Sequence, residues 1–565
     1  MKVAVEGCCH GELDTIYSQI QALETRNKYT VDLLLICGDF QAIRNHQDLQ
    51  CMAVPDKYKQ LGGFYKYYTG EKTAPVLTIV IGGNHEASNY MWELYHGGWL
   101  APNIYYLGEA GCVRVNGVRI AGASGIFKSH DFTRGHFEKM PYDRSMVRSI
   151  YHIREYAVRK LSLLTSRLQV FLSHDWPQSI TDHGDLPTLL QRKTFLRGDI
   201  MSGQLGSPPL LGLLRALQPE WWFAAHLHTR FEACVVHGEP TAADAASDEI
   251  AVDASEQVQR DPNEIVIDDE ELDAAPAPPS AASAPVSRDP NEIVLDDEEF
   301  DAAPAPAPPA PVPRAPLNPD EITLSDLEDE VVAPPPPPPP APNRAPPRRQ
   351  PQKWARPAAL PGQRTTNFLA LDKCGPKRQY LEVVDIPMPQ GFLPPDSVSD
   401  SVSDSPTNKG KGKATTPPPR LTYDLEWLAI SRAFHPFLAL TQFQRAFPLE
   451  DAARALVAEA RTWITDDLRA REPYLDAEDL EVTQVQEFVM TAPGPGREDE
   501  VGGRRAQPPW YTNPQTVKFC ELIGVVNRIN APPTAPAAAA AVPADKSVLK
   551  PGDDAAVHAM LFREV

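Results

Sequence analysis

Residues 76–86 read Val-Leu-Thr-Ile-Val-Ile-Gly-Gly-Asn-His-Glu, a mainly apolar run that stops at two glycines and three polar side chains. A short run rich in β-branched residues and bounded by Gly and Asn is typical of a buried β-strand. The Asn, the His and the Glu therefore stand at the carboxyl end of a predicted strand. All three are residue types that bind metal ions.

The same arrangement recurs through residues 1–235, where short apolar runs alternate with helical patterns. Apolar residues from Ile150 to Leu164 recur at helical spacing, which predicts an amphipathic helix over residues 145–165 that packs on a sheet. The alternation predicts an α/β domain. The predicted strands are 3–5, 31–36, 76–81, 118–121, 168–172 and 221–225.

Side chains able to bind metals follow five of these strands. In an open α/β sheet, ligands bind at the carboxyl ends of the strands, so these residues are expected to meet in one crevice. A single His-x-His or Gly-Asp is a weak indication of a metal site, whereas five such clusters in order are a strong one. The residues are Cys8, His10, Asp39, Asn84, His85, His174, His226 and His228.

The chemistry of this set favours hydrolysis of a phosphoester. Imidazoles, a carboxylate and an Asn carbonyl suit Fe²⁺, Mn²⁺ or Zn²⁺, and a thiolate at Cys8 favours iron and zinc. The number of ligands fits two ions bridged by Asp39, which together stabilise the attacking and leaving oxygens of a displacement at phosphorus. The imidazole of His85, beside a proposed ligand, is placed to protonate the leaving alkoxide. The expected division puts His10 and His228 on one ion and Asn84, His174 and His226 on the other.

The order of these motifs resembles the calcineurin-like metallophosphoesterase superfamily, whose pattern is Asp-x-His, Gly-Asp, Gly-Asn-His-Glu/Asp, His and Gly-His-x-His. The sequence departs from it at Cys8, where the pattern has Asp. With that departure, residues 5–14, Val-Glu-Gly-Cys-Cys-His-Gly-Glu-Leu-Asp, resemble the RNA lariat debranching enzymes, and the resemblance extends through 130–154 and from 365 to about 529. It implies a double β-sandwich flanked by helices and a metal-dependent hydrolase of the 2′,5′-phosphodiester in excised intron lariats.

The resemblance also implies roles for individual residues. Cys8 is either a ligand or a residue that shapes the site so that a single tightly bound metal suffices. Glu86 and Asp175 are interpreted as outer groups that orient the ligand histidines. The implied ligands are His10, Asp39, Asn84, His174, His226 and His228, with His85 as general acid.

Residues 128–160 carry eight Lys and Arg against four acids, interleaved with aromatic residues. Basic charge attracts phosphates and aromatic faces stack unpaired bases, so this region is expected to bind branched single-stranded RNA, like the lariat recognition loop it resembles. From residue 148 onward, the basic residues Arg148, Arg154, Arg159 and Lys160 fit the solvated face of a helix equally well. The candidate RNA contacts are Lys128, Arg134, Lys139, Tyr142 and Arg144.

Residues 236–364 are expected to be a disordered acidic insert. Residues 241–340 hold 25 Asp and Glu against 3 Lys and Arg, in a chain of net charge −21, and 28 of the 59 prolines fall within 240–362. A repeat at 260–271 returns at 288–299. Each copy holds a β-prone run followed by four acids, which resembles a SUMO-interacting motif, so SUMO or SUMO-modified proteins are a candidate partner through 263–271 and 291–299. The alternative is a duplicated acidic spacer.

A smaller α+β domain is expected at 365–530, interrupted by a disordered break at 397–417 and followed by a disordered tail at 531–565. Short strands near 368–371 and 380–384 and helices near 425–440 and 449–464 account for its pattern. The fold class expected for the whole chain is therefore α/β, with a catalytic domain at 1–235.

The composition also predicts where the protein works. No run of 18 apolar residues and no hydrophobic leader are present, so neither membrane insertion nor secretion is expected. The eight cysteines lack CxxC spacing, which predicts neither a zinc finger nor a disulfide framework. A lariat substrate implies the nucleus. Other functions compatible with the sequence are a linear nucleic-acid phosphodiesterase, a phosphomonoesterase of the same superfamily, and a SUMO-binding splicing scaffold; the oligomeric state is left open.

Overall fold

The structure, a computed structural model, describes residues 1–165, 167–238, 363–389, 418–471, 477–496, 503 and 505–532. The described residues on the two sides of the predicted insert belong to one compact unit. Both acidic repeats, the break at 397–417 and nearly all of the tail lie outside the described residues, so the expectations about them stay predictions.

The first sheet has the strand order β12-β1-β2-β3-β5-β4 in the part of the chain described. Strands β1, β2 and β3 run parallel, with Val5 opposite Leu35 and Leu35 opposite Ile79. These strands therefore end at the same edge of the sheet. Their bounds are β1 Lys2–Glu6, β2 Leu33–Ile36, β3 Leu77–Val80, β4 Gly98–Ala101, β5 Ile104–Tyr106 and β12 Leu381–Asp385.

The second sheet has the order β10-β11-β9-β8-β7-β6-β13. Strands β7, β8, β9 and β11 run parallel in it, while β6, β10 and β13 are antiparallel to their neighbours. The bounds are β6 Ala110–Val115, β7 Val118–Ala123, β8 Val170–Ser173, β9 Trp221–Ala224, β10 Phe231–Val236, β11 Thr365–Ala370 and β13 Leu421–Tyr423.

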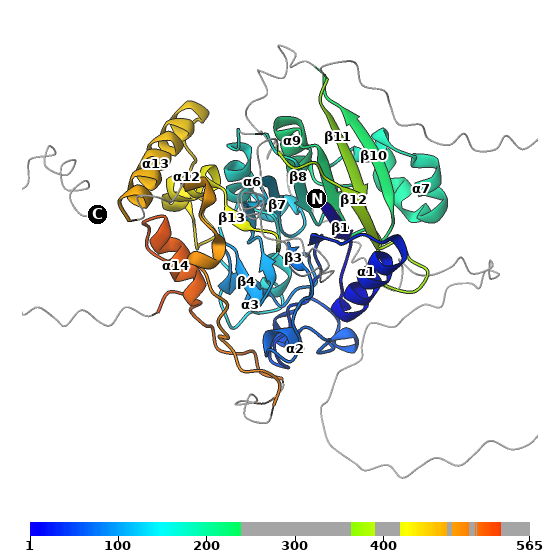
Figure 1. Cartoon of the computed structure of the whole chain (residues 1–565), viewed down its shortest axis with the longest axis horizontal. Helices are drawn as coiled ribbons and strands as arrows, with labels where there is room; N and C mark the ends of the chain where they lie inside the picture. The colour runs from blue at the N-terminus through cyan, green and yellow to red at the C-terminus, as the bar shows by residue number, and fades with distance from the viewer. Residues whose placement is uncertain are drawn as a thin grey trace, which may run out of the picture. The chain divides into compact units, whose positions relative to one another are not determined.

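Strands from beyond the insert complete both sheets. β11 lies between β9 and β10, and β12 pairs with β1 across the register Val5 to Glu382 (Figure 1). The two strands predicted near 368–371 and 380–384 are therefore confirmed as strands. They are built into the sheets that carry the site, which the sequence pattern did not indicate.

Helices flank both sheets, and those from beyond the insert also contribute to the cluster between the sheets. The bounds of the α-helices are α1 Leu13–Asn27, α2 Tyr65–Tyr68, α3 Ser88–Glu93, α4 Ser129–Phe132, α5 Met146–Ser149, α6 Glu155–Ser162, α7 Leu186–Arg192, α8 Arg197–Met201, α9 Pro208–Leu217, α12 Leu425–Phe434, α13 Glu450–Arg471 and α14 Pro514–Leu522. Single 3₁₀ turns occur at Asp48–Cys51, Asp56–Tyr58, Ile180–His183, Thr194–Leu196, His435–Phe437, Ala477–Asp479 and Val482–Gln484.

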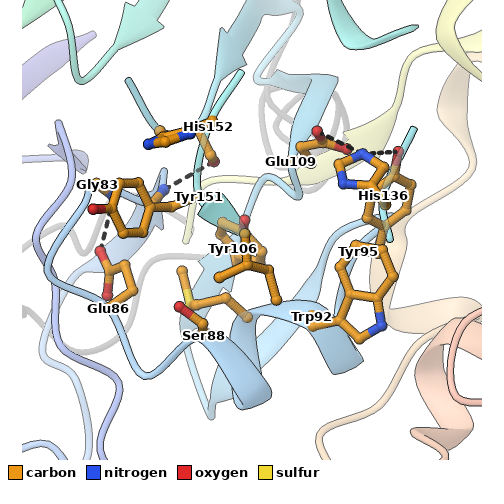
Figure 2. Close-up of a pocket in the computed structure, with 15 residues that line it drawn as sticks. Gly83, Glu86, Ser88, Trp92, Tyr95, Tyr106, Glu109, His136, Tyr151 and His152 are labelled. Atoms are coloured by element: carbon orange, nitrogen blue, oxygen red, sulfur yellow. Dashed lines mark hydrogen bonds and ion pairs between the residues drawn. The ribbon is translucent and has the colours of Figure 1, made fainter. Parts of the chain in front are cut away.

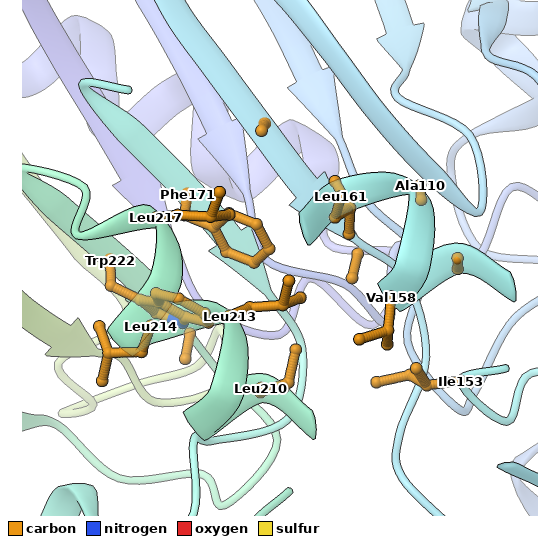
Figure 3. Packing of buried hydrophobic residues seen from close by; sticks show 14 of the residues in the cluster. Ala110, Ile153, Val158, Leu161, Phe171, Leu210, Leu213, Leu214, Leu217 and Trp222 are labelled. Atoms are coloured by element: carbon orange, nitrogen blue, oxygen red, sulfur yellow. The ribbon is translucent and has the colours of Figure 1, made fainter. Parts of the chain in front are cut away.

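Three buried clusters show how these layers stack. One lies between the sheets, since it joins Val5 and Leu35 of the first sheet to Leu172 and Phe223 of the second. Another packs α1 against the outer face of the first sheet. The third packs α6 and α9 against the outer face of the second sheet, where Phe171 and Trp222 stack at 4.2 Å (Figure 3). The expected double β-sandwich flanked by helices is confirmed.

The predicted helix over 145–165 is wrong in one respect, because it is two short helices, α5 and α6, with a break at residues 150–154. Arg154 has extended backbone angles, and its guanidinium donates hydrogen bonds to the carbonyl oxygens of Asp131 and Ser149. These buried bonds pull the chain out of a continuous helix. All eight cysteines are free and buried. In the described residues, no helix is both long and apolar enough to cross a membrane.

Candidate metal centre

The ends of the parallel strands carry the predicted ligands, but they come from two sheets and not from one open sheet. β1 leads into Cys8 and His10, β2 into Asp39, and β3 into Asn84 and His85, all at one edge of the first sheet. In the second sheet, β8 leads into His174, and β9 into His226 and His228. Both sheets of the expected sandwich therefore supply ligands.

The two sets nevertheless meet. Nε2 of His174 lies 3.1 Å from Oδ1 of Asn84, and Nε2 of His10 lies 3.2 Å from Nε2 of His228. The rings of His174 and His226 are 5.0 Å apart between centroids. Side chains from sequence positions 218 residues apart are therefore in contact, as the motif order predicted.

Asp39 stands at the centre of the cluster. Its Oδ1 lies 3.4 Å from Nε2 of His174, whereas its Oδ2 lies 3.7 Å from Nε2 of His10 and 3.8 Å from Nδ1 of His85. Each carboxylate oxygen thus faces a different group of imidazoles. This is the arrangement that a carboxylate bridging two ions needs.

Two glycines make this close approach possible. A Cβ on Gly83 would overlap Oδ1 of Asp39, and a Cβ on Gly38 would overlap Nδ1 of His174. Gly38 also has φ +107°, which L side chains rarely adopt. The Gly residues that precede the polar residues in the sequence motifs are therefore part of the site.

The backbone is strained at four of the predicted ligands. His10, Asp39, His226 and His228 have φ between 46° and 66°, the left-handed region that non-glycine residues rarely occupy. Such conformations cost free energy and gather at functional sites, where the surrounding structure holds them in place.

The protonation states suit metal binding. Burial lowers the pKa of His226 to about 3 and lowers that of His228, so both imidazoles are neutral and can offer a lone pair. Burial alone would raise the pKa of Asp39, but the imidazoles of His174, His85 and His10 hold it well below its usual range. An ionised carboxylate beside the neutral imidazoles of His226 and His228 fits a divalent cation.

The orientation of His174 is set by the backbone. Its Nδ1 lies 2.7 Å from the carbonyl oxygen of Cys37. Because a carbonyl only accepts, Nδ1 carries the proton and Nε2 is left to face Asp39 and Asn84. This corrects the expectation that Asp175 or Glu86 orients the histidines.

Glu86 and Asp175 instead fix the loops around the centre. Glu86 accepts hydrogen bonds from the backbone N–H groups of Phe40, Gln41 and Gly83, at 2.8 to 3.0 Å. Asp175 accepts from the N–H groups of Phe127 and Trp176. Burial and the charge of Asp39 raise the pKa of Glu86 to about 7.

Cys8 lies within the cluster. The ligand atoms of Cys8, His10, Asp39 and His228 all lie within 4.8 Å of one another. The Cys8 thiol is fully buried and accepts a hydrogen bond from the N–H of His226 at 3.2 Å. Burial and the nearby Asp39 and Glu6 raise its pKa well above its usual value. Cys8 is therefore positioned beside one half of the cluster, as a thiol in the absence of a cation.

His10 and His85 form the accessible side of the centre. Their side chains are 17% and 16% exposed, whereas those of Asp39 and His174 are 2% and 0% exposed. A substrate therefore approaches the cluster past these two imidazoles.

The region 128–160 presents only part of its basic charge to solvent. Lys128 is half-buried, and Arg134, Lys139 and Arg144 are exposed. Tyr142 is only 6% exposed and packs beside Cys51, Val147 and Ile150, so its ring is a wall of the region and not an open stacking face.

Arg154 and Lys160 do not lie on a solvated helix face. The Arg154 side chain is 0% exposed and donates to Oε1 of Glu138 at 2.6 Å. Nζ of Lys160 lies 4.4 Å from the centroid of the Trp427 ring. Sequence reasoning missed both roles, because a buried cation has no periodic pattern of its own.

A second group of possible metal ligands occurs in this region, formed by His130, Asp131 and His152. Nδ1 of His152 lies 2.7 Å from Oδ2 of Asp131, whose other oxygen pairs with Arg134 at 3.1 Å and faces Arg154 at 3.7 Å. Two guanidinium groups already neutralise this carboxylate and repel a cation, so the group is better described as a structural ion-pair network.

A cavity of about 50 Å³ lies beside the centre (Figure 2). Gly83 and Glu86 line it on one side, and Trp92, Tyr95 and His136 on another. Its lining is largely apolar and includes His136, Tyr151 and His152 of the region 128–160.

Comparisons with known proteins agree with this geometry. Residues 1–230 match the family model for calcineurin-like phosphoesterases, which implies the use of divalent metals. Residues 363–528 match the model described as the lariat debranching enzyme C-terminal domain.

Individual relatives extend the match over most of the chain. The chain is similar to the lariat debranching enzyme of Schizosaccharomyces pombe, at 36% identity over 94% of this chain and 98% of that protein. It is 37% identical to the enzyme of Drosophila pseudoobscura over 93% of this chain and 77% of that protein. Lariat debranching enzyme A of Xenopus laevis is 59% identical over 42% of this chain, a stretch that spans 44% of the Xenopus protein.

Proposed function

The chain belongs to the lariat debranching enzyme family, and on that premise we propose that it hydrolyses the 2′,5′-phosphodiester bond at the branch point of excised intron lariat RNA. The observation that carries this proposal is the convergence of imidazoles from both sheets on the ionised Asp39 at an accessible edge. The products are a linear RNA with a 2′-hydroxyl at the branch nucleotide and a 5′-phosphate on the released strand.

The residues at the strand ends would hold the metal. Asp39 would bridge two ions, with His10 and His228 on one side. Fe²⁺, Zn²⁺ and Mn²⁺ suit this donor set, and occupancy by one or two ions depends on whether Cys8 is a ligand. When bound, the metal supplies charge stabilisation at the phosphate and hydroxide at neutral pH. The remaining ligands would be Asn84, His174 and His226.

His85 would act as the general acid. Its backbone N–H donates to Oδ1 of Asp39 at 2.9 Å, and its imidazole lies on the accessible side near Oδ2 of the same residue. A water oxygen forms a bond to phosphorus and loses a proton to solvent, and the bond from phosphorus to the 2′ oxygen breaks. The imidazolium of His85 gives its proton to that leaving oxygen and is protonated again from solvent.

Discrimination between linkages would come from the region 128–160. Exposed Arg134, Lys139 and Arg144, with Lys128 at the entrance, would bind phosphates of the RNA arms. Holding the branch in one geometry restricts hydrolysis to the 2′,5′ linkage, because the metal centre alone would accept any phosphodiester within reach. Tyr142 would support this surface from inside.

We also propose that the protein works in the nucleus, where lariats arise, and that the two acidic repeats bind SUMO. The repeats lie outside the described residues, so this proposal rests on their sequence alone. A titration of a peptide of residues 260–273 against SUMO tests it. The absence of chemical-shift changes at millimolar peptide would rule it out.

The experiment that tests the main proposal uses one RNA with both a 2′,5′ and a 3′,5′ linkage at the same adenosine. Metal-loaded protein is expected to cut only the 2′,5′ bond. Cleavage of both bonds would indicate a general phosphodiesterase, and no cleavage by metal-loaded protein would favour a scaffold role.

A further inference from the structure

A second hollow, of about 330 Å³, lies between the region 128–160 and residues near the end of the described chain. Trp92, Glu138, Lys139, Trp510 and Arg528 are among the residues that line it. Its volume falls in the range of sites that hold small organic groups. None of these residues belongs to the metal centre.

The walls of this hollow are fixed by bonds between distant parts of the chain. The N–H of Tyr142 donates to Oε1 of Gln507, and Nε2 of Gln507 donates to the Tyr142 carbonyl, both at 2.7 Å. The N–H of His136 donates to the carbonyl of Ala439 at 2.9 Å. The hollow is therefore preformed, and binding does not have to assemble it.

The lining combines an aromatic face with positive charge. Trp510 is 42% exposed, and Lys139, which also lines the hollow, is exposed. The Arg528 guanidinium is held by a hydrogen bond to the carbonyl of Leu438 at 2.8 Å. Proteins bind unpaired bases by stacking them on aromatic rings while cations contact the neighbouring phosphates.

Glu138 provides an independent observation. It is 5% exposed, and its Oε1 accepts hydrogen bonds from Arg154 at 2.6 Å and from the Ser149 hydroxyl at 2.5 Å. Its Oε2 is buried and accepts no hydrogen bond from the described residues. A buried acceptor without a donor costs free energy, so a ligand that brings an N–H group to the lining would relieve that cost.

The hollow also adjoins the metal centre. Trp92 and His136 line both this hollow and the cavity of Figure 2, and Gly83 and Glu86 line that cavity on the opposite side. Gly83 and Glu86 flank the Asn84-His85 pair in the sequence. The hollow is therefore connected through two shared residues to the cavity beside the centre.

We propose that this hollow binds one unpaired nucleobase of the RNA, away from the bond that is cut. The base stacks on Trp510 and donates an N–H group to Oε2 of Glu138, while Lys139 contacts an adjoining phosphate. This inference rests on the proposed function, since it takes RNA as the substrate, and it makes the C-terminal segment part of substrate recognition.

The test compares binding of two linear, dye-labelled decamers to the full chain by fluorescence anisotropy. One is an all-adenosine RNA, and the other carries the same phosphates but no bases. Trp510→Ala is expected to weaken binding of the adenosine decamer about tenfold, in the range for loss of one stacked base, and to leave the abasic decamer unchanged. Trp510→Phe, which keeps a ring, is expected to retain most of the affinity.

Phe443→Ala is the matched control, because Phe443 is 76% exposed and does not line the hollow. Glu138→Gln, which keeps the oxygen that binds Arg154, is a second variant and is expected to weaken only the adenosine decamer. Unchanged binding in both Trp510→Ala and Glu138→Gln would overturn the proposal, as would an equal loss for the two decamers. If those preparations still cut the branched RNA, the proposed debranching function would stand and only the base-binding site would be ruled out.

Discussion

Val236 and Thr365 face each other as the last cross-strand pair of β10 and β11, although 128 residues lie between them in the chain. Beyond them, the N–H of His237 donates to the carbonyl of Arg364 at 2.9 Å. The two ends of the insert are therefore attached to neighbouring positions of the second sheet, like the loop of a β-hairpin.

Replacing residues 239–362 by Asn-Gly is therefore expected to preserve the fold. Activity on a small branched RNA should stay within a few-fold of the full chain. For the flexible chain that the composition of the insert predicts, closing a shorter loop should raise the free energy of unfolding by up to about 3 kcal/mol. Denaturant unfolding measures this. A scrambled insert of equal length is the control, and a collapse in activity or solubility on shortening would contradict the prediction.

His85→Ala should lower turnover by about 10² to 10⁴ without changing the metal content, because it removes a proton donor and leaves the ligand cluster in place. Single-turnover kinetics and elemental analysis of the same sample test both halves. His174→Ala is the comparison and should lose metal, since Nε2 of His174 faces Asp39 and Asn84. Loss of metal from His85→Ala would make His85 a ligand.

Removal of metal should lower the thermal stability of the protein. A cation at 100 times its dissociation constant stabilises the folded state by about 2.7 kcal/mol, which corresponds to a few degrees in the melting temperature. Melting curves with and without chelator measure the shift. Asp39→Asn removes the central charge and should melt at the same temperature in both conditions. An equal shift in that variant would place the stabilising ion elsewhere.

Replacing Lys128, Arg134 and Lys139 together by Ala should weaken RNA binding and flatten its salt dependence. For each phosphate of a single strand that the protein no longer neutralises, the slope of log K against log salt should fall in magnitude by about 0.7. Replacing Arg454, Arg461 and Arg469 of α13 removes the same charge from another surface and serves as the control. An unchanged slope in the first variant would take these residues off the binding surface.

Lys160→Met should stabilise the protein at neutral pH. Burial lowers the pKa of Lys160 from 10.5 to about 8, so between these values the unfolded chain binds more protons than the folded one. Burial of Lys160 therefore lowers the free energy of unfolding by roughly 3 kcal/mol below pH 8. This loss becomes smaller as the pH rises toward 10.5. Denaturant unfolding of the unmodified protein and of Lys160→Met should show that the variant gains less unfolding free energy at pH 9.5 than at pH 7. Lys518→Met, at an exposed position, should show no such trend.

The strands and the ligands at their ends could be predicted from the sequence because both are local. A strand such as the one predicted at 76–81 can be recognised from six consecutive residues, and the polar residues that follow it mark its end. The pairing of β11 with β9 could not be predicted in this way, since it joins segments far apart in the chain and leaves no local pattern.

The second kind of feature that sequence reasoning missed is burial of charge. Arg154 reads as part of a basic helix face, yet its partners Asp131, Glu138 and Ser149 surround it only in the folded chain. Likewise, Glu86 and Asp175 were placed correctly beside the centre, but their partners are backbone N–H groups. Which atom a polar side chain contacts depends on loop geometry that residue type does not encode.

The position of β11 between β9 and β10 has a consequence for synthesis on the ribosome. Translation finishes β9, with His226 and His228 just beyond it, before Thr365 exists, and β10 reaches the second sheet only through β11. At about 5–20 residues per second, the 128 intervening residues take roughly 6–25 s to emerge. During that interval β9 has one open edge and β10 has no partner in the sheet, which exposes the nascent chain to mispairing. The length of the insert thus sets the time between synthesis of β10 and synthesis of β11, the strand that completes the second sheet.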